Sequence, residues 1–473
     1  MSAAALWIYI PFFTGAVLLM MPEQRRFTRI VSLVLTAFLA YTALRIPVNS
    51  MIVVNRTSLI FSASTRLLGR PVTIDRADQT LVAFFYTFAF LWIFGSMFTR
   101  IYRFFIPTTL ISTALLIGVI AVKPFIYGIF LIMICVLLFL PMLNSSGVHN
   151  EDSIFRFLLY QLLGMICLAI SGQLTGTLDI NPQDSYLLKR TVILIFAGFS
   201  LWLAVFPFFS WIAALMEKSC PFVSGFVVSL LQFSSLFILL QFLNDHLWLR
   251  TYQPLFRGLR IVGCMMLAVG SIWAFCQKNL QRMMAFIITA ENGASVLLLG
   301  TNSHESINTF LTGLFLHSIV WLIWATSVKF MSDDTDLSLD SLKGFAFRHP
   351  VVCTALLLSQ FTISGMPILA GFRLKMSLIS SCFAYSDRLG WITAAASAML
   401  IFSGLRLMYV FLSPGQAEAS AALPVDERTR YEYLMRRILL IILMVLLVLI
   451  SFFPSIMEIF MSGIRTQYAL LFG

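Results

Sequence analysis

Charged residues are scarce in this chain, and their scarcity limits the class of protein. Only 11% of the 473 residues are Asp, Glu, Lys or Arg, whereas a soluble domain carries about 25%. Hydrophobic residues make up 59% of the chain, and the mean hydropathy is +0.91. This composition excludes a large soluble domain and predicts an all-α polytopic membrane protein.

Cysteine pairs and clusters of metal ligands are also lacking. The seven cysteines are scattered without a Cys-x-x-Cys pair, which is typical of small packing residues rather than of a disulfide framework or a metal site. The sequence offers no plausible set of ligands for haem, zinc or an iron–sulfur cluster. We therefore expect no cofactor in this chain. The net charge of +11 is spread over short loops between apolar runs. It therefore favours anchoring in the lipid bilayer and argues against nucleic acid as a partner.

Long apolar stretches predict about fourteen transmembrane helices, because each is long enough to cross about 30 Å of hydrocarbon. The twelfth stretch is the longest, and glycine and proline interrupt it. The predicted spans are 4–21, 27–46, 80–98, 104–121, 124–142, 154–174, 189–206, 222–243, 259–277, 283–300, 308–331, 350–384, 390–413 and 434–457.

The connecting segments predict orientation and two local structures. A small excess of Lys and Arg on one side of the predicted spans marks that side as the inner one and favours both termini on the outer side.

Residues 47–79 form the longest outer loop. Its β-prone runs at 52–60 and 72–74, around Gly69, predict a short hairpin. Residues 207–221 predict an amphipathic segment that lies at the inner interface.

Lys375 is the most informative single residue. It follows the helix break at Gly365 and Pro367, inside a run that lies in the membrane. An ionisable group at membrane depth is retained only when it is paired, hydrated or used. A break there is tolerated only where the freed backbone faces protein or a water-filled cavity. Ion transport is therefore the leading hypothesis.

Two further titratable residues lie at membrane depth. Glu291 is nine residues past Arg282, at the inner end of its span, and His317 is nine residues past the outer start of the next span. Because these spans are antiparallel neighbours, both side chains are expected near mid-depth. A carboxylate and an imidazole can exchange a proton if water connects them. The alternative is a hydrogen-bonded structural pair.

The remaining charges near the spans have simpler interpretations. Arg373 can extend toward the outer interface, and Arg406 toward the inner one or onto a neighbouring carbonyl. With Arg282, they are possible supporting residues of a proton path. The aspartates of the inner loop are interpreted as solvated, because their spacing lacks the glycine and the terminal glutamate of an EF-hand. They are Asp333, Asp334, Asp336 and Asp340.

Four segments carry a resemblance to a known family. Gly198 to Trp211 resembles the pattern Gly-Phe-x-x-Lys-x-x-x-Phe-Pro-x-His-x-Trp. Asn279 to Gly293 resembles Asp-Leu-Lys-Arg-Leu-Leu-Ala-Tyr-Ser-Ser-Ile-Ser-Gln-x-Gly. His317 to Leu322 resembles His-Ala-Phe-Phe-Lys-Ala, and Gly365 to Lys375 resembles Gly-x-Pro-x-x-x-Gly-Phe-x-x-Lys. These patterns are those of the antiporter-like membrane subunits of respiratory complex I (NADH:quinone oxidoreductase), which are shared with Mrp cation/proton antiporters and membrane-bound hydrogenases.

The departures from the family concern its proton path. The resemblance implies a glutamate in the fifth helix, a lysine in the seventh, a histidine after the proline that follows it, a titratable residue in the eighth helix and a lysine after His317. In this chain the corresponding positions hold Val136, Trp202, Phe209, Gln232, Phe233 and Trp321. A proton relay needs groups that bind and release a proton near working pH. The family's input half is therefore dismantled here, and Glu291, His317 and Lys375 remain.

The resemblance implies a domain organisation with two inverted five-helix repeats and broken helices. We expect helices 1–3 with the outer hairpin at 1–103, the first repeat at 104–243, the second repeat at 259–413 and the last helix at 434–473. The first repeat is expected to act as a scaffold.

The resemblance also implies the function, a subunit of a complex I-type assembly that contributes to proton translocation by an altered or partly lost path. Other membrane subunits would be its partners, they would carry any redox chemistry, and a bacterial inner membrane or an equivalent energy-coupling membrane would hold it. The alternatives are a non-pumping structural subunit, or a component of an Mrp-type antiporter, a membrane-bound hydrogenase or an inorganic-carbon uptake system.

Overall fold

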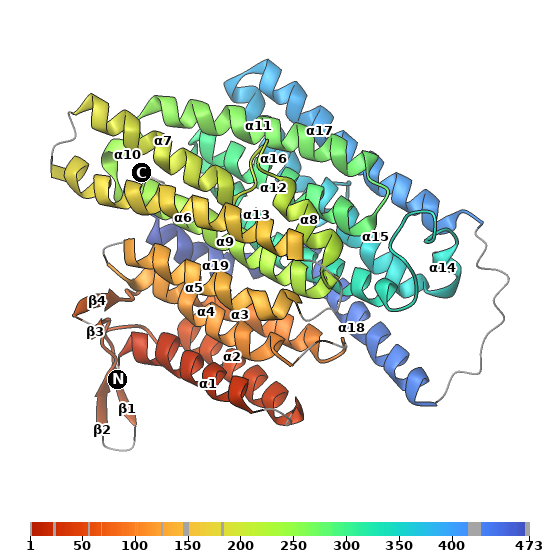
Figure 1. The fold of residues 1–473 in the computed structure, drawn as a ribbon, viewed down its shortest axis with the longest axis horizontal. Coiled ribbons are helices and arrows are strands. Elements are labelled where there is room, and N and C mark those ends of the chain that lie inside the picture. The colour runs from red at the N-terminus through yellow and green to blue at the C-terminus, as the bar shows by residue number, and fades with distance from the viewer. Residues whose placement is uncertain are drawn as a thin grey trace.

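The chain forms a bundle of helices that run side by side along one direction (Figure 1). The computed structural model describes residues 2–21, 25–54, 57–67, 69–99, 101, 103–123, 126–144, 151–180, 184–414 and 427–468. Two small β-hairpins lie at one end of the bundle, which we call the hairpin end (Figure 1). The opposite end, which carries the segment 333–344, is called the loop end. The all-α polytopic fold predicted from the sequence is confirmed.

The elements follow one another as the apolar runs predict. The first half contains a π-helical turn (Ala5–Tyr9), α1 (Ile10–Met20), α2 (Arg25–Arg45), β1 (Met51–Val54), β2 (Thr57–Ile60), β3 (Ser64–Leu67), β4 (Arg70–Thr73), α3 (Gln79–Ser96), α4 (Phe105–Ala121), α5 (Ile126–Leu143), α6 (Glu151–Ile180), α7 (Ser185–Trp202), α8 (Ser210–Lys218) and α9 (Pro221–Asp245). The second half contains α10 (Leu247–Thr251), α11 (Gln253–Cys276), α12 (Leu280–Thr301), α13 (His304–Ser332), α14 (Phe345–Arg348), α15 (Pro350–Ser364), α16 (Ala370–Tyr385), α17 (Asp387–Leu412), α18 (Glu427–Phe452) and α19 (Ser455–Gln467).

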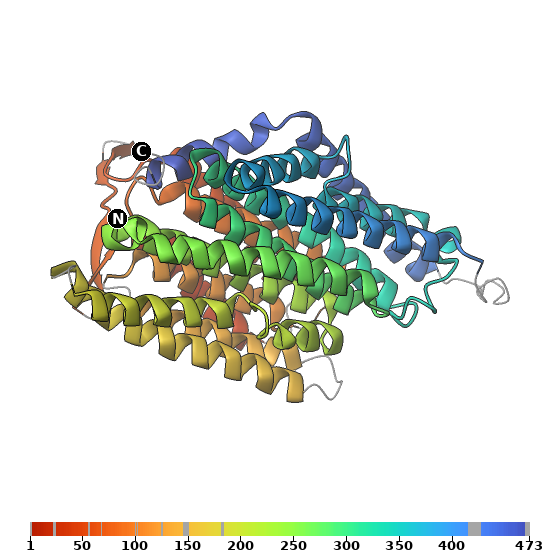
Figure 2. The same cartoon turned by 90° about the horizontal axis from the view of Figure 1, so that it is seen from above.

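Among the described residues, eleven helices are long and apolar enough to cross a membrane. Three shorter apolar helices accompany them, at Ala5–Met20, Phe105–Ala121 and Pro350–Ser364. Each of the fourteen predicted spans overlaps one of these helices. Seen from above, the chain passes from helices of residues 150–200 at one edge, through the green middle, to the blue C-terminal helices at the other (Figure 2).

Two of the spans are interrupted. The twelfth predicted span divides into α15 and α16, separated by residues 365–369, as the glycine and proline predict. In the first half the interruption falls between α7 and α8, whereas α9, the eighth span, is a continuous helix. Five of the nine residues of α8 are buried, and the helix packs against α6 and α12. The prediction that 207–221 lies on the bilayer interface is therefore wrong for this part of the segment.

The outer loop contains two hairpins rather than the single predicted one. β1 pairs with β2, and β3 pairs with β4, both antiparallel. The residues 52–60 thus fold back on themselves instead of pairing with 72–74. Only the second turn contains Gly69, which has a φ of +78°, a conformation that glycine adopts without strain.

The centre of the bundle is formed by α9 and α12. In their most apolar windows, 94% of the α9 residues and 100% of the α12 residues are buried. Aromatic side chains fill the space between α3 and α9, where the ring of Phe88 lies 5.9 Å from that of Phe226 and 5.6 Å from that of Phe233, measured between centroids. Because lipid is as apolar as these side chains, van der Waals packing rather than the hydrophobic effect holds the helices together.

Glycines allow α11 and α12 to approach each other closely. A Cβ on Gly263 would lie 2.5 Å from the backbone nitrogen of Leu297, and one on Gly293 would lie 2.6 Å from that of Leu267. No side chain fits into these contacts, so the helix that carries Glu291 is fixed against α11 by backbone-to-backbone packing.

We expect Gly263→Leu to lower the free energy of unfolding by at least 1–3 kcal/mol, about the cost of overpacking, because α11 must move away from α12. Thermal unfolding of the purified protein in detergent measures this change. Gly176→Leu on α6 is the matched control, since a Cβ there meets nothing within 4 Å. Equal effects of the two substitutions would contradict the close-packing argument.

At the hairpin end, Asp78 connects the C-terminal helix to the start of α3. Its Oδ1 accepts a hydrogen bond from Gln467 Nε2 at 2.7 Å, and its Oδ2 accepts one from the backbone N–H of Asp75 at 2.9 Å. Burial raises the pKa of Asp78 from 3.8 to about 6. The folded protein therefore holds this proton more tightly than the unfolded chain does.

The raised pKa of Asp78 predicts a pH-dependent stability. Its contribution to stability is complete below pH ~4 and is lost as the pH rises through about 6. We expect the melting temperature of the wild type to fall relative to that of Asp78→Asn over this interval, because the amide does not titrate. Melting curves of both proteins at several pH values make the comparison. A difference that stays constant with pH would refute the assignment.

Candidate functional site

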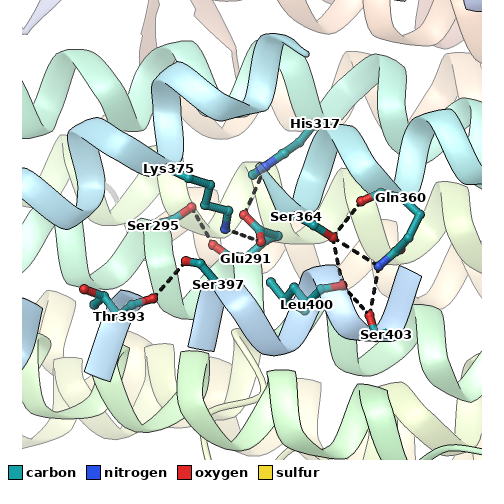
Figure 3. A network of polar contacts seen from close by, with 10 residues as sticks. All are labelled: Glu291, Ser295, His317, Gln360, Ser364, Lys375, Thr393, Ser397, Leu400 and Ser403. Carbon is teal, nitrogen blue, oxygen red and sulfur yellow. Dashed lines mark hydrogen bonds and ion pairs between the residues drawn. The ribbon is translucent and has the colours of Figure 1, made fainter. Parts of the chain in front are cut away.

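Three titratable side chains from three helices meet inside the second half of the bundle (Figure 3). Glu291 comes from α12, His317 from α13 and Lys375 from α16. Their exposed fractions are only 3%, 9% and 6%. Glu291 is eleven residues from the start of α12, which places it about 17 Å along the helix. We call these three residues the triad.

Both oxygens of the Glu291 carboxylate have a partner. Lys375 Nζ donates to Oε1 at 2.5 Å, and His317 Nε2 lies 3.3 Å from Oε2. Figure 3 shows the two partners approaching the carboxylate from different helices. Pairing of this kind is what allows a carboxylate to stay ionised in a medium of low dielectric constant.

The helix break between α15 and α16 positions Lys375. Gly365 has a φ of +78° and Ile368 a φ of +79°, so the chain turns sharply before α16 begins. A Cβ on Gly365 would lie 2.4 Å from Lys375 Cγ, and one on Gly371 would lie 1.6 Å from the carbonyl oxygen of Thr362. Gly365 therefore lets the lysine side chain pass directly over the break toward Glu291, and Gly371 lets α16 approach the backbone of Thr362 on α15.

A small cavity adjoins the triad. Its volume is about 30 Å³, which is room for one or two water molecules at roughly 10–15 Å³ each. Glu291, His317 and Lys375 all line it, together with Ser295 and Thr309. The site therefore combines three proton-binding groups with space for water, the two elements that a proton relay requires.

A neutral polar network lies beside the triad. Gln360 donates to Ser403 Oγ at 3.1 Å, and Ser364 Oγ donates to the carbonyl of Leu400 at 3.0 Å (Figure 3). Gln360 also accepts from Trp324 Nε1 at 3.3 Å. These bonds satisfy the polar atoms around the helix break. Sequence reasoning missed this network, although a glutamine between apolar residues in the long twelfth span is a signal that could have marked it.

The possible supporting residues lie away from the triad. Arg373 is exposed on α16. Arg406 donates to the backbone carbonyls of Phe275 and Gln277, which is the carbonyl contact predicted as one alternative. Arg282 lies 3.6 Å from Glu217 at the start of α12. The structure brings together Glu291, His317 and Lys375, but not these arginines.

Two aspartates of the inner loop are exposed and also form ion pairs. Asp333 lies 2.6 Å from Lys329 Nζ and 2.9 Å from Arg436 of α18. Asp334 accepts from the Tyr433 hydroxyl at 2.8 Å and lies 3.4 Å from His349. Both aspartates are exposed, as the solvated interpretation predicts. Their ion pairs were not predicted, because the sequence does not show that the start of α18 packs against the end of α13.

In the first half of the bundle, neutral groups occupy the positions of the missing path. Trp202 Nε1 donates to the carbonyl of Gln161 at 3.1 Å, and Gln232 Nε2 donates to the carbonyl of Trp202 at 3.2 Å. Gln232 Oε1 accepts from Asn292 Nδ2 at 2.7 Å. This row of side chains, which we call the amide bridge, ends beside Glu291 and contains no group that titrates.

Comparison with known proteins assigns the family. Residues 125–403, more than half of the chain, match the model of the NADH:quinone oxidoreductase/Mrp antiporter transmembrane family. The chain belongs to this family. The match includes all three residues of the triad and the amide bridge.

Sequence relatives are named as subunits of NADH-quinone oxidoreductase. Subunit N 2 of Acidobacterium capsulatum is 24% identical over 68% of this chain and 69% of its own length. Subunit N of Pelagibacter ubique is 24% identical over 44% of each chain. The aligned part thus spans less than half the length of the second relative.

Solved structures share the fold. A chain of the Mrp complex from Dietzia sp. DQ12-45-1b superposes with a TM-score of 0.79 at 14% identity, over 99% of this chain and 97% of that one. A chain of respiratory complex I from Thermus thermophilus gives a TM-score of 0.73 at 17% identity, over 99% and 100%. At these identities the likeness is one of fold.

We expect Lys375→Met to lower the free energy of unfolding by about 3–5 kcal/mol, because it leaves the Glu291 carboxylate buried without its cation. The double variant Lys375→Met/Glu291→Gln should recover most of this loss. Thermal unfolding in detergent compares the variants, with Arg373→Met, an exposed cation on the same helix, as the control. Additive losses in the double variant would show that the two groups do not interact.

Proposed function

We propose that this chain is an antiporter-like membrane subunit of a multi-subunit complex of the NADH-quinone oxidoreductase type, and that the triad binds and releases a proton during the cycle of that complex. The contact that carries the proposal is the 2.5 Å pair of Lys375 Nζ and Glu291 Oε1, with His317 3.3 Å from the second oxygen. Family membership and the names of the sequence relatives support the assignment to such a complex.

The triad can take up a proton at a defined atom. With Glu291 ionised, Lys375 charged and His317 neutral, the three groups carry no net charge. A neutral imidazole that donates through Nε2 to Glu291 has an unprotonated Nδ1. An incoming proton therefore binds at His317 Nδ1 and is stabilised by the adjacent carboxylate. When Lys375 moves toward or away from Glu291, the same carboxylate holds the proton more weakly or more tightly.

The two halves of the chain have different roles in this proposal. The first repeat, 104–243, serves as a scaffold, because the amide bridge contains no titratable group. The second repeat, 259–413, carries the proton. The partners are other membrane subunits, which carry any redox chemistry, and the location is a bacterial inner membrane or an equivalent energy-coupling membrane.

A non-pumping structural subunit is the second candidate, and the amide bridge is the observation that favours it. Neutral hydrogen bonds from Gln161 to Asn292 hold the two halves in register without a path for protons between them. The two candidates differ in whether the triad changes its protonation during turnover.

Proton-to-electron stoichiometry of the reconstituted complex separates the two functions. We expect Lys375→Met and His317→Ala each to lower the number of protons moved per electron, because the triad loses its cation or its proton acceptor. The assembled complex is used, and Arg373→Met is the control for a lost cation on the same helix. A stoichiometry that stays at the wild-type value in both variants overturns the translocation proposal and leaves the structural role.

A further inference from the structure

An arginine without a charged partner lies inside the bundle near its hairpin end. Arg260 is the eighth residue of α11, which begins at that end, so it lies about 10 Å along the helix. Its exposed fraction is only 7%. Nη1 donates to the carbonyl oxygen of Gly300 at 2.6 Å, and Nη2 donates to the hydroxyl of Tyr385 at 2.6 Å. Both acceptors are neutral, and among the described residues no carboxylate forms an ion pair with Arg260.

The two hydrogen bonds use only part of what the Arg260 guanidinium offers. It has five N–H donors, and its charge is permanent. The Gly300 carbonyl belongs to the last turn of α12, where carbonyl groups carry only a partial negative charge. Ionisable groups at membrane depth are almost always paired with an opposite charge or with carbonyl groups. Arg260 therefore has both charge and donors left for an anion.

Tyr385, near the end of α16, connects Arg260 with the lipid-facing surface. The centroid of its ring lies 3.9 Å from Arg260 Cζ, and 53% of the residue is exposed. Because the phenol oxygen accepts from the guanidinium, its own O–H remains available to donate to a further acceptor. An anion at this hydroxyl would also be attracted by the Arg260 charge.

Two exposed arginines lie at the same end of the bundle. Arg257 is one turn before Arg260 on α11, and Arg388 is three residues after Tyr385, in the first turn of α17. The helices α11 and α17 pack side by side (Figure 1), and both begin at the hairpin end. We call Arg257, Arg260, Tyr385 and Arg388 the arginine cluster.

Acidic residues do not balance the arginine cluster. The sequences of α11 and α16 contain no Asp or Glu, and that of α17 contains only Asp387, which is exposed. Glu305, at the start of α13, accepts from Ser377, which lies eight residues before Tyr385 on α16. On these three helices, the hairpin end therefore carries three arginines against one aspartate.

The surface beside the arginine cluster is apolar and aromatic. Trp391 follows Arg388 by one turn on α17 and is 69% exposed, and Ile261 and Ile392 are exposed as well. Tryptophan and tyrosine next to arginine are typical of the level at which lipid headgroups lie. A ligand that matches this surface needs an anionic group for the arginines and hydrocarbon chains for the apolar side chains.

We propose that the arginine cluster binds the phosphate of an anionic phospholipid, whose acyl chains lie against the exposed apolar side chains of α11 and α17. The Tyr385 hydroxyl donates to a phosphate oxygen, and the buried charge of Arg260 strengthens this bond. Arg257 and Arg388 attract the headgroup at the surface. A lipid with a net negative charge is preferred over a zwitterionic one, because the arginines repel the ammonium group of the latter. The site is separate from the triad and does not depend on its titration.

The experiment measures lipid binding to the assembled complex in phosphatidylcholine vesicles. Photoactivatable phosphatidylglycerol is added in increasing amounts, and its crosslinks to peptides of α11 and α17 are quantified by mass spectrometry. We expect saturable labelling with phosphatidylglycerol and none that saturates with a photoactivatable phosphatidylcholine. Arg388→Gln should raise the half-saturating amount about fivefold, the effect of one cation near the surface. Arg260→Gln should raise it at least about tenfold, since a hydrogen-bonded charge is lost.

Arg190→Gln is the matched control, because Arg190 is an exposed arginine at the hairpin end of α7, outside the cluster. It should leave the half-saturating amount unchanged. Tyr385→Phe and Arg388→Gln alter exposed side chains, so they test the site even if Arg260→Gln does not fold. Equal values for Arg388→Gln and Arg190→Gln, or equal saturation by both lipids, overturn the proposal. Loss of a neighbouring subunit in Arg260→Gln, with wild-type labelling in Arg388→Gln, also overturns it, since a carboxylate of that subunit would then be the anion.

Discussion

The rest of the second half depends on one constraint, the cost of holding the Glu291 carboxylate inside the membrane. An uncompensated charge at the centre of a bilayer costs at least about 2.5–3.5 kcal/mol, so the fold must bring a cation to it. That cation, Lys375, lies 84 residues further along the chain. The interruption between α15 and α16 directs it toward Glu291, and Gly365 provides the space for its side chain. The break in the helix thus serves to bring the cation to the buried carboxylate.

The same constraint explains why α12 is so rigidly held. A carboxylate accepts a hydrogen bond only within a few tenths of an ångström of the ideal distance, so the helix that carries it cannot shift. Close contact at Gly263 and Gly293 fixes α12 against α11 on one side, and α9 covers it on another. The cavity, in contrast, is lined by Lys375 and His317, the two partners of the carboxylate.

Helix positions and the members of the triad could be predicted from the sequence, because both follow from local rules. Apolar length predicts a span, and counting residues from the span ends places Glu291 and His317 at one depth. Contacts that depend on packing between distant elements could not be predicted. The pairing of Asp333 with Arg436, the burial of α8 and the division of the outer loop into two hairpins all belong to this group. The amide bridge was missed for a related reason, since Gln232 and Asn292 carry no charge and any polar neighbour can satisfy them.

The neutral side chains of the amide bridge remove the need for buried counter-charges in the first half. A lysine at position 202 would need a counter-charge, and Val136, at the family's glutamate position, offers none. Tryptophan removes that need, because its indole N–H is satisfied by the carbonyl of Gln161 and its rings fill the volume against Gly164, where an added Cβ would lie 2.4 Å from Trp202 Cδ1. Once one member of a buried charge pair is lost, its partner becomes a cost, and loss of the second charge stabilises the fold. The first half therefore needs no charge at these positions, whereas in the second half Lys375 and His317 each pair with Glu291.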